Sequence, residues 1–324
     1  MSRARFLLIR IVKAAVVVFA IAVANFFLVR MAPGDPAQVL AGQSGAADEK
    51  YLAQLRQQFG LDQPMHAQFV IHMSNTARLD LGYSHRQQQP VAQLIAERLP
   101  ATLLLTGCAF VLSISAGVML GVWSARKVGT WTDSAITTGA LLFYATPIFW
   151  AGLLLVLVFS VQLEWLPAYG MSTIGGSLAG AGLVLDVARH AVLPVLTLSL
   201  FYMAIYARLT RASMLEVSQM DFVKTARAKG LTEHEVMYRH VLRNALLPVI
   251  TYAGIHAGGL VGGSIVVETI FAWPGIGRLA FEAVSQRDYS VLLGIFLVIS
   301  ILVVIINLLT DLLYAAVDPR IELK

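Results

Sequence analysis

The stretch Asp221–Pro248, DFVKTARAKGLTEHEVMYRHVLRNALLP, is a charged island between two long apolar runs. Asp221 is expected to cap a first short helix, and Gly230 is placed to end that helix in a left-handed conformation. The apolar residues of this helix that fall on one side are Phe222, Val223 and Ala226. The pattern predicts a helix that stops sharply at a glycine corner.

A second helix is expected to begin directly after the corner. Thr232 and Glu235 have the N-cap and N3 spacing of a capping box. Apolar residues then recur at helical spacing up to Pro248, where the helix is expected to end; they are Val236, Met237, Val241 and Leu242.

The corner between the two helices carries little side chain. Ala226, Ala228 and Gly230 surround it, so another surface could approach closely. We interpret the segment as a docking hairpin; the alternative is an ordinary solvated hairpin.

The composition is that of a polytopic membrane protein. Apolar residues make up 57% of the 324 residues and charged residues only 13%, against about 25% charged residues in soluble domains. The single cysteine, Cys108, lies in an apolar run and is expected to fill space as a small hydrophobe.

The first 94 residues predict one span and an external cap. Within residues 1–30, Ser2–Lys13 holds four basic residues and an uncharged run follows. This favours a retained first span over a signal peptide because the run continues past the small-residue site Ala22–Ala24. Residues 31–94 are polar and predict an extracytoplasmic cap. Surface helices are expected at Asp48–Phe59, after Pro64, and at Pro90–Arg98.

Residues 95–316 are expected to form the membrane core. The second span is Ala101–Trp123, and the third is Ala135–Val161, which is longer than needed and is expected to bend at Thr146-Pro147. Ile174–Val187 is short and rich in glycine, which predicts a re-entrant or interfacial piece. The fourth span is Ala191–Ala207.

The fifth predicted span, Leu246–Val267, contains glycines at intervals of four and one histidine. Glycines at this spacing let helix backbones approach closely; they are Gly254, Gly258 and Gly262. His256 lies in mid-span, where a polar side chain needs a partner or water. We expect an interhelical hydrogen bond, with contact to a transported substrate as the alternative.

The sixth span is Ser290–Val317, and residues 317–324 form a short polar tail. Six spans place both ends on the same side. With a cytoplasmic N-terminus, fifteen of the 24 lysines and arginines fall on inner segments, as the positive-inside rule requires. The inner loop 208–248, which holds the hairpin, is then cytoplasmic.

The sequence offers no signature of chemistry. It contains no phosphate-binding Gly-x-x-x-x-Gly-Lys-Ser/Thr loop, no zinc-type cluster and no Gly-x-Ser-x-Gly elbow. We therefore expect no enzymatic activity, no resident metal and no cofactor in this chain. A membrane pathway with a cytoplasmic hairpin suggests that another protein delivers the energy.

Asp221–Pro248 resembles the cytoplasmic signature loop of ABC-importer permeases, with Lys224, Thr225, Ala226 and Gly230 at the matching positions. Lys224 and Thr225 depart from the Glu-Ala pair of the general pattern. With these departures, the stretch is similar to that of the dipeptide and oligopeptide permeases and of their nickel and glutathione relatives. Further resembling stretches are Pro33–Pro36, Phe59–Pro64, Leu99–Thr102 and Glu268–Gly277.

The resemblance implies the type I ABC importer permease fold, with six membrane helices and alternating access. It implies a second permease subunit, two cytoplasmic ATPases that bind ATP and magnesium, an extracytoplasmic binding protein, and a bacterial inner-membrane location. It assigns ATPase docking to a coupling helix made of Asp221, Phe222, Lys224, Thr225, Ala226, Arg227, Ala228, Lys229 and Gly230.

Several alternatives stay open at this point. The cargo implied is di- or oligopeptide, with nickel or glutathione as alternatives. An ion-coupled carrier and a non-transporting membrane scaffold are the competing classes. No residue is assigned to the substrate beyond the candidate His256.

Overall fold

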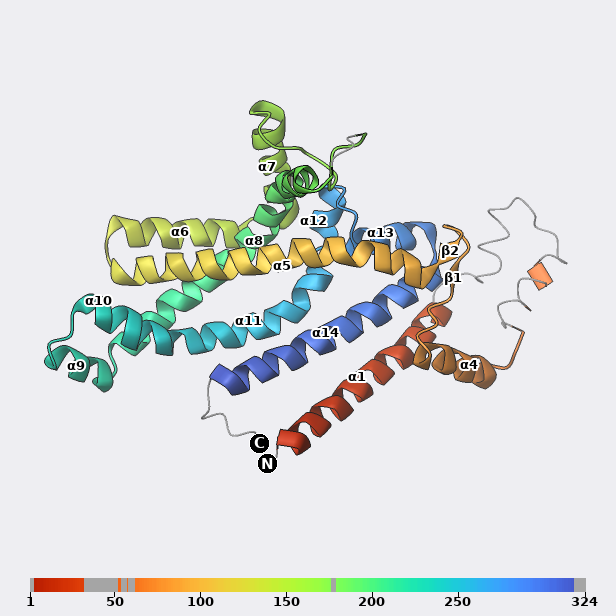
Figure 1. The fold of residues 1–324 in the computed structure, drawn as a ribbon, viewed down its shortest axis with the longest axis horizontal. Helices are drawn as coiled ribbons and strands as arrows, with labels where there is room; N and C mark the ends of the chain where they lie inside the picture. The colour runs from red at the N-terminus through yellow and green to blue at the C-terminus, as the bar shows by residue number, and fades with distance from the viewer. Residues whose placement is uncertain (1–2, 32–51, 54–56, 58–61, 176–178, 318–324) are drawn as a thin grey trace. The chain divides into compact units, whose positions relative to one another are not determined.

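The computed structural model describes residues 3–31, 52–53, 57, 62–175 and 179–317, and it is almost entirely helical (Figure 1). Contacts divide the chain into two units. Unit 1 holds the chain up to Leu99 and Leu279–Ile305, and unit 2 holds Pro100–Arg278 with Ile306–Ile321. Of the predicted cap, the Pro33–Pro36 turn and most of Asp48–Phe59 lie outside the described residues.

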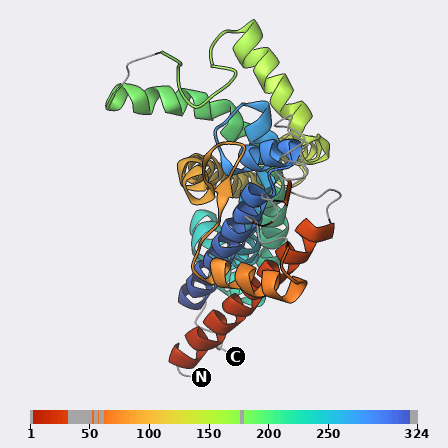
Figure 2. The same cartoon turned by 90° about the vertical axis from the view of Figure 1, so that its right-hand side faces the viewer.

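Unit 1 is built on α1, Arg3–Met31, and α4, Met65–Ala77. Pro64 directly precedes α4, as predicted from its fixed backbone angle. The two helices pack across each other (Figure 2), with the ring of Phe26 buried edge-on against Phe69 at 5.1 Å. An aromatic contact of this kind adds to the apolar burial that holds the pair together.

A small hairpin precedes the long helix α5, Val91–Arg126. Its strands β1, Tyr83–Ser84, and β2, Gln89–Pro90, pair antiparallel. Ser84 is buried and donates a hydrogen bond to Asp288. The predicted helix Pro90–Arg98 is therefore not separate, because α5 runs on through Pro100 into the second span.

The third predicted span is broken rather than bent. It consists of α6, Trp131–Ala145, and α7, Ile148–Leu155, which continues into the π-helical segment η1, Val156–Gln162. The two halves meet at 106°. The break falls at Thr146-Pro147 as predicted, because proline has no N–H for the carbonyl of Phe143 and disfavours a helical conformation at the residue before it.

The sequence predicted that Ile174–Val187 is a re-entrant or interfacial piece, separate from a fourth span that begins at Ala191. This separation is wrong. One helix, α8, runs from Ala181 to Ser218 and includes Pro194. Asp186, near the start of α8, accepts hydrogen bonds from the backbone N–H and the hydroxyl of Thr173 at 2.7 and 2.8 Å. Its carboxylate ties the preceding loop to the first turns of α8.

After α8 come α9, Asp221–Ala228, and α10, Glu233–Glu235, followed by the π-helical η2, Val236–Leu242. The chain then continues as α11, Arg243–Gly263, and α12, Ile265–Ile270. Pro248 lies inside α11, so the predicted helix end there is wrong. Pro248 has no N–H to donate to the carbonyl of Asn244, four residues earlier, yet the helix continues through it.

The remaining helices are α13, Ile276–Gln286, and α14, Tyr289–Val317. In the described part of the chain, four helices are long and apolar enough to cross a membrane. The bent pair α6 and α7–η1 raises that number to five. The predicted fifth span coincides with α11 and α12, and the count of six stays a prediction.

Within unit 2, α5 and α8 approach at two glycines. A Cβ placed on Gly117 would lie 2.5 Å from the Cβ of Tyr206, and one on Gly121 would lie 2.6 Å from the carbonyl oxygen of Ala207. Only a residue without a side chain fits there. The Gly117–Gly121 pair therefore sets the distance between the two helices.

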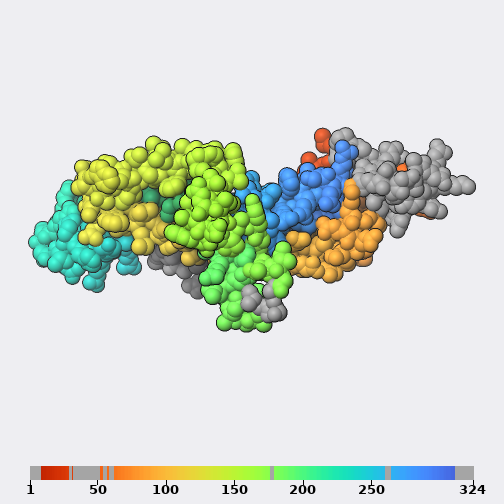
Figure 3. All heavy atoms as spheres, turned by 90° about the horizontal axis from the view of Figure 1, so that it is seen from above, coloured from red at the N-terminus to blue at the C-terminus, as the bar shows by residue number. Residues whose placement is uncertain are grey.

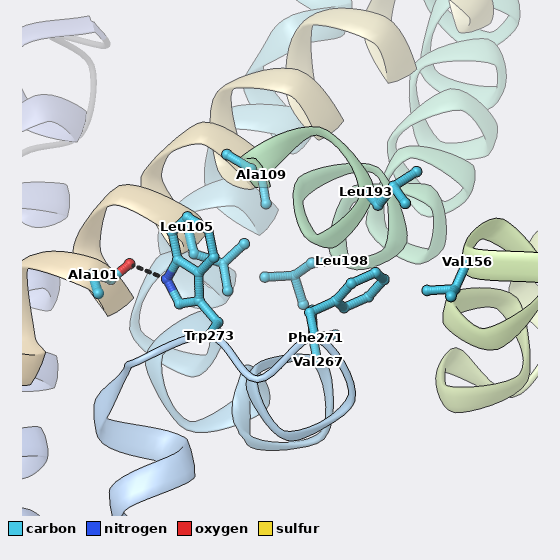
Figure 4. Packing of buried hydrophobic residues seen from close by; sticks show 10 residues of the cluster. Ala101, Leu105, Ala109, Val156, Leu193, Leu198, Val267, Phe271 and Trp273 are labelled. Carbon is cyan, nitrogen blue, oxygen red and sulfur yellow. Dashed lines mark hydrogen bonds between the residues drawn. The ribbon is translucent and has the colours of Figure 1, made fainter. Parts of the chain in front are cut away.

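A large apolar cluster of unit 2 surrounds Trp273, which is fully buried. Figure 4 shows the indole of Trp273 beside Leu105 on α5, with its N–H pointing at the carbonyl of Ala101. That hydrogen bond is 2.8 Å long. Because the indole N–H has a partner, the ring is buried without leaving a polar group unsatisfied.

Candidate functional site

The corner of the Asp221–Leu242 hairpin has the predicted backbone. Gly230 has φ of +80°, the left-handed conformation that favours glycine. Thr232 and Glu235 form a reciprocal capping box: the Thr232 hydroxyl accepts from the Glu235 N–H, and the Glu235 carboxylate accepts from the Thr232 N–H. Both ends of the corner are therefore fixed by local bonds.

An ion pair ties the two helices across the corner. Arg227 on α9 donates from Nε and Nη2 to the two carboxylate oxygens of Glu233 on α10, at 3.1 and 2.9 Å. The Arg227 guanidinium holds the pKa of Glu233 below its usual value. Hydrogen bonds from the side chain and backbone of Thr232 likewise lower the pKa of Glu235.

The inner face of the hairpin is a packed apolar cluster. Val223 and Ala226 on α9 and Val236 and Val241 on η2 are buried. They pack on the ends of α5 and α8, through Val122, Ala125, Met214 and Val217. In Figure 3 the cyan atoms of the hairpin lie at the end of unit 2, beside the yellow end of α5. The hairpin is thus packed directly on two long helices.

On the outer face of the hairpin, Asp221 and Phe222 are not placed as the sequence predicted. Met220 is the N-cap of α9, and Asp221 lies in the first turn, where its carboxylate pairs with Lys224 at 2.8 Å. Phe222 does not share the inner face, since 40% of its surface is exposed. Apolar surface is exposed on this side at Met220, Phe222 and Leu231.

A second cluster forms around Glu268, which is completely buried on α12. Its carboxylate accepts hydrogen bonds from the hydroxyls of Thr102 and Ser264, both at 2.8 Å, and from the backbone N–H of Arg278 at 2.9 Å. The Thr102 hydroxyl also accepts from the N–H of Ile276. Two stretches far apart in the sequence, Pro100–Thr102 and Glu268–Gly277, therefore meet at one carboxylate.

The two glycines of the Glu268–Gly277 loop make room for that carboxylate. A Cβ on Gly275 would lie 2.4 Å from the Glu268 carboxylate, and one on Gly277 would lie 2.8 Å from the Cα of Ile265. The loop can close around the acid only with glycine at both positions. This cluster joins the start of the second span to the end of α12.

A third polar cluster joins α6 to α8. Asp133 is buried and binds Arg211 through both carboxylate oxygens, at 2.7 and 2.8 Å. Ser124 and the backbone N–H of Gly129 also donate to this carboxylate. A buried acid with this many donors is well satisfied, and it fixes the turn after α5 against α8.

The other predicted site residues lie on α11. Gly254 and Gly258 are buried, and the surroundings of Gly262 lie outside the described side chains. The structure shows no hydrogen bond for His256 among the described residues. Its ring instead contacts Tyr202 at 4.7 Å and Tyr252 at 4.3 Å.

Comparison with known proteins shows which family this chain resembles. Residues 117–323 match the model of the binding-protein-dependent transport system inner membrane component, and residues 3–106 match the model of its N-terminal part. The chain belongs to this family. It is a multi-pass membrane permease subunit of an ABC importer.

Two relatives support the assignment along nearly the whole permease. A probable peptide ABC transporter permease protein of Sinorhizobium fredii is 39% identical over 98% of this chain and 99% of its own. The glutathione transport system permease protein of Escherichia coli is 42% identical over 94% of this chain and 95% of its own. Family membership implies an importer with another permease, ATPase subunits and a binding protein.

The fold is similar to a solved permease structure. A chain of the inward-facing MetNI methionine ABC transporter matches with a TM-score of 0.57 and 18% identity, over 71% of this permease and 98% of that chain. The similarity concerns the fold only.

Sequence reasoning missed the contacts that hold the permease core together. The two stretches that form the Glu268 cluster, Leu99–Thr102 and Glu268–Gly277, could be recognised in the sequence. Nothing in the sequence indicated that they are in contact. The Gly117–Gly121 pair has the small-xxx-small spacing that was noticed on α11 but not on α5. Asp133 and Arg211 are 78 residues apart, and nothing in the sequence pairs them.

Proposed function

We propose that this permease forms half of the translocation pathway of a peptide importer and docks a cytoplasmic ATPase on the outer face of the Asp221–Leu242 hairpin. The second half would come from a related permease, and an extracytoplasmic binding protein would deliver the peptide. Both termini and the hairpin would face the cytoplasm, with six spans in total. ATP and magnesium would be bound by the ATPase subunits.

The observation that carries the proposal is the stiffness of the hairpin. A glycine corner, a capping box and the Arg227–Glu233 pair fix the two helices to each other. Its inner face is packed on α5 and α8, while Phe222 and Leu231 are exposed. A rigid element moves as a body when pushed, whereas a flexible loop would absorb the displacement.

The peptide class rests on the names of the two relatives, one a peptide and one a glutathione permease. Glutathione is itself a short peptide, so the two names describe related cargo. Competition for uptake by dipeptides, longer peptides, glutathione and nickel, in cells lacking this gene and complemented with it, would identify the cargo.

The test of docking is Gly230→Asp in the complete importer. The new side chain both disfavours a φ of +80° and places a charge on the docking face, so we expect ATP-dependent uptake to fall at least tenfold at normal permease abundance. Gly175→Asp is the matched control, because Gly175 has φ of +81° and open space around it but lies outside the hairpin. Undiminished uptake by the Gly230→Asp importer would refute the docking role.

A further inference from the structure

A chain of aromatic rings runs across three helices of unit 2. Tyr144, at the end of α6, stacks on Phe201 of α8 at 5.3 Å, and Phe201 meets Tyr202 at 5.3 Å. Tyr202 contacts His256 of α11, which contacts Tyr252 at 4.3 Å. We call these five residues, Tyr144, Phe201, Tyr202, Tyr252 and His256, the aromatic ladder.

The ladder is neither buried nor satisfied. Tyr144 is 45% exposed, and the other four side chains are partly exposed. Among the residues that the structure describes, none is hydrogen-bonded to the three tyrosine hydroxyls or to the His256 ring. Polar groups at membrane depth are costly against lipid unless they find a partner or water.

The ladder also lies at the break in the third span. Tyr144 is the second-last residue of α6, directly before Thr146-Pro147. Because Pro147 has no N–H, the carbonyl of Phe143 lacks its helical donor and is available as an acceptor. Broken membrane helices with free carbonyls are typical of substrate sites in transporters.

A cation completes the arrangement. The guanidinium of Arg208 lies 5.7 Å from the centre of the Tyr144 ring, and Arg208 is exposed. The ladder thus offers apolar ring faces, hydroxyl groups, a free backbone acceptor and a positive charge. A peptide presents the complementary set: apolar side chains, backbone amides and a terminal carboxylate.

We infer that the aromatic ladder, with Arg208, lines the translocation pathway and contacts the peptide as it crosses. The inference rests on the proposed function, which supplies the peptide class. The rings would slide past side chains of many kinds, the tyrosine hydroxyls would exchange hydrogen bonds with backbone amides, and Arg208 would attract the carboxylate.

The test is the reactivity of a single cysteine at position 256. Cys108 is the one cysteine of the chain, so Cys108→Ser gives a thiol-free permease into which His256→Cys is introduced. A thiol must ionise in water to react. Ile255→Cys is the matched control, because Ile255 is 71% exposed on the same helix but contributes no ring to the ladder.

In the assembled importer we expect a water-soluble methanethiosulfonate reagent to modify His256→Cys at least tenfold faster than Ile255→Cys. Saturating trialanine with the binding protein and ATP should slow the modification severalfold. Tyr202→Cys provides a second position if the first variant assembles poorly. A rate equal to that of Ile255→Cys, or a fast rate that trialanine leaves unchanged, would overturn the inference.

A second measurement examines the cation. The same binding protein is used with every permease variant. Any change in the ratio of trialanine turnover to trialanine amide turnover is therefore caused by the permease. Arg208→Gln should lower turnover of the free acid at least fivefold more than that of the amide, whereas Arg189→Gln, outside the ladder, should leave the ratio unchanged. If Arg208→Gln and Arg189→Gln give the same ratio, Arg208 does not belong to the site. Loss of ATP-dependent uptake in the unaltered importer would instead contradict the proposed function.

Discussion

Glu268 shows how one residue can organise a membrane core. The carboxylate is fully buried, and three donors from α5, α12 and α13 surround it. An acid buried without such partners would be strongly destabilising. The threonine and serine hydroxyls satisfy the acid, and the two glycines leave room for the loop to close around it.

At this scale we predict that Gly277→Ala destabilises the permease by about 1–3 kcal/mol, the usual cost of overpacking. The added methyl would lie 2.8 Å from the Cα of Ile265 and 2.9 Å from Oε2 of Glu268, so backbone has to move. Gly139→Ala in α6 is the control: it meets no atom within 4 Å, and alanine should raise helix stability slightly. Thermal unfolding in detergent would measure both, and equal midpoints would contradict the prediction.

The sequence predicted residues that interact with near neighbours in the chain far better than residues whose partners lie on other helices. The left-handed Gly230 and the Thr232–Glu235 box follow from neighbours in the chain and are confirmed. The partners of Glu268 and Asp133 come from other helices, and a single sequence carries no record of such contacts. The outward position of Phe222 was also missed, because helical periodicity alone does not say which side a short helix buries.

Among the elements, the hairpin combines a rigid corner with a packed base. Its outer bonds are charge-assisted and exposed, so each contributes little alone. The buried cluster of Val223, Val236 and Val241 supplies the stability, and the corner bonds supply the shape. The hairpin is therefore expected to keep its fold when its surface charges change. The defined geometry of the corner is expected to be lost before the packing of the buried cluster.

Acid should loosen that corner in a defined range. The pKa values of Glu233 and Glu235 are lowered in the fold by Arg227 and Thr232, so their stabilising effect is complete above the ordinary value of 4.5 and is lost as the pH falls through the lowered values. We predict unchanged amide protection at Thr232 and Glu235 from pH 7 to 5, and falling protection below 4.5.

Hydrogen exchange corrected for its intrinsic pH dependence would measure this. Glu235→Gln should remove most of the change at Thr232. Loss of protection already between pH 7 and 6 would contradict the assignment to the two glutamates.

Helix boundaries were predicted with mixed success for identifiable reasons. The break at Thr146-Pro147 is confirmed, whereas Pro248 lies inside α11 instead of ending a helix. A proline interrupts a helix only where the surrounding packing does not restore it. The short, glycine-rich stretch Ile174–Val187 likewise suggested a separate piece, although α8 already begins at Ala181 within it.

At the level of the whole permease, the composition alone indicated a polytopic membrane protein, and the family comparison confirms it. In the proposed function, the hairpin is the element that joins this membrane part to an energy source. If it docks on an ATPase, then the packing of Val122, Met214 and Val217 under it provides the route by which nucleotide-driven movement reaches α5 and α8.

The most direct measurement is thiol cross-linking from the hairpin corner in the working importer. With Cys108→Ser, an Ala228→Cys permease should be joined by a short thiol-to-amine cross-linker to an ATPase subunit, and the product should no longer import peptide. Ser172→Cys, in a loop outside the hairpin, is the control and should give no such product. A transporting complex in which Ala228→Cys never cross-links to an ATPase, or is labelled only from outside the cell, would contradict the docking of this hairpin.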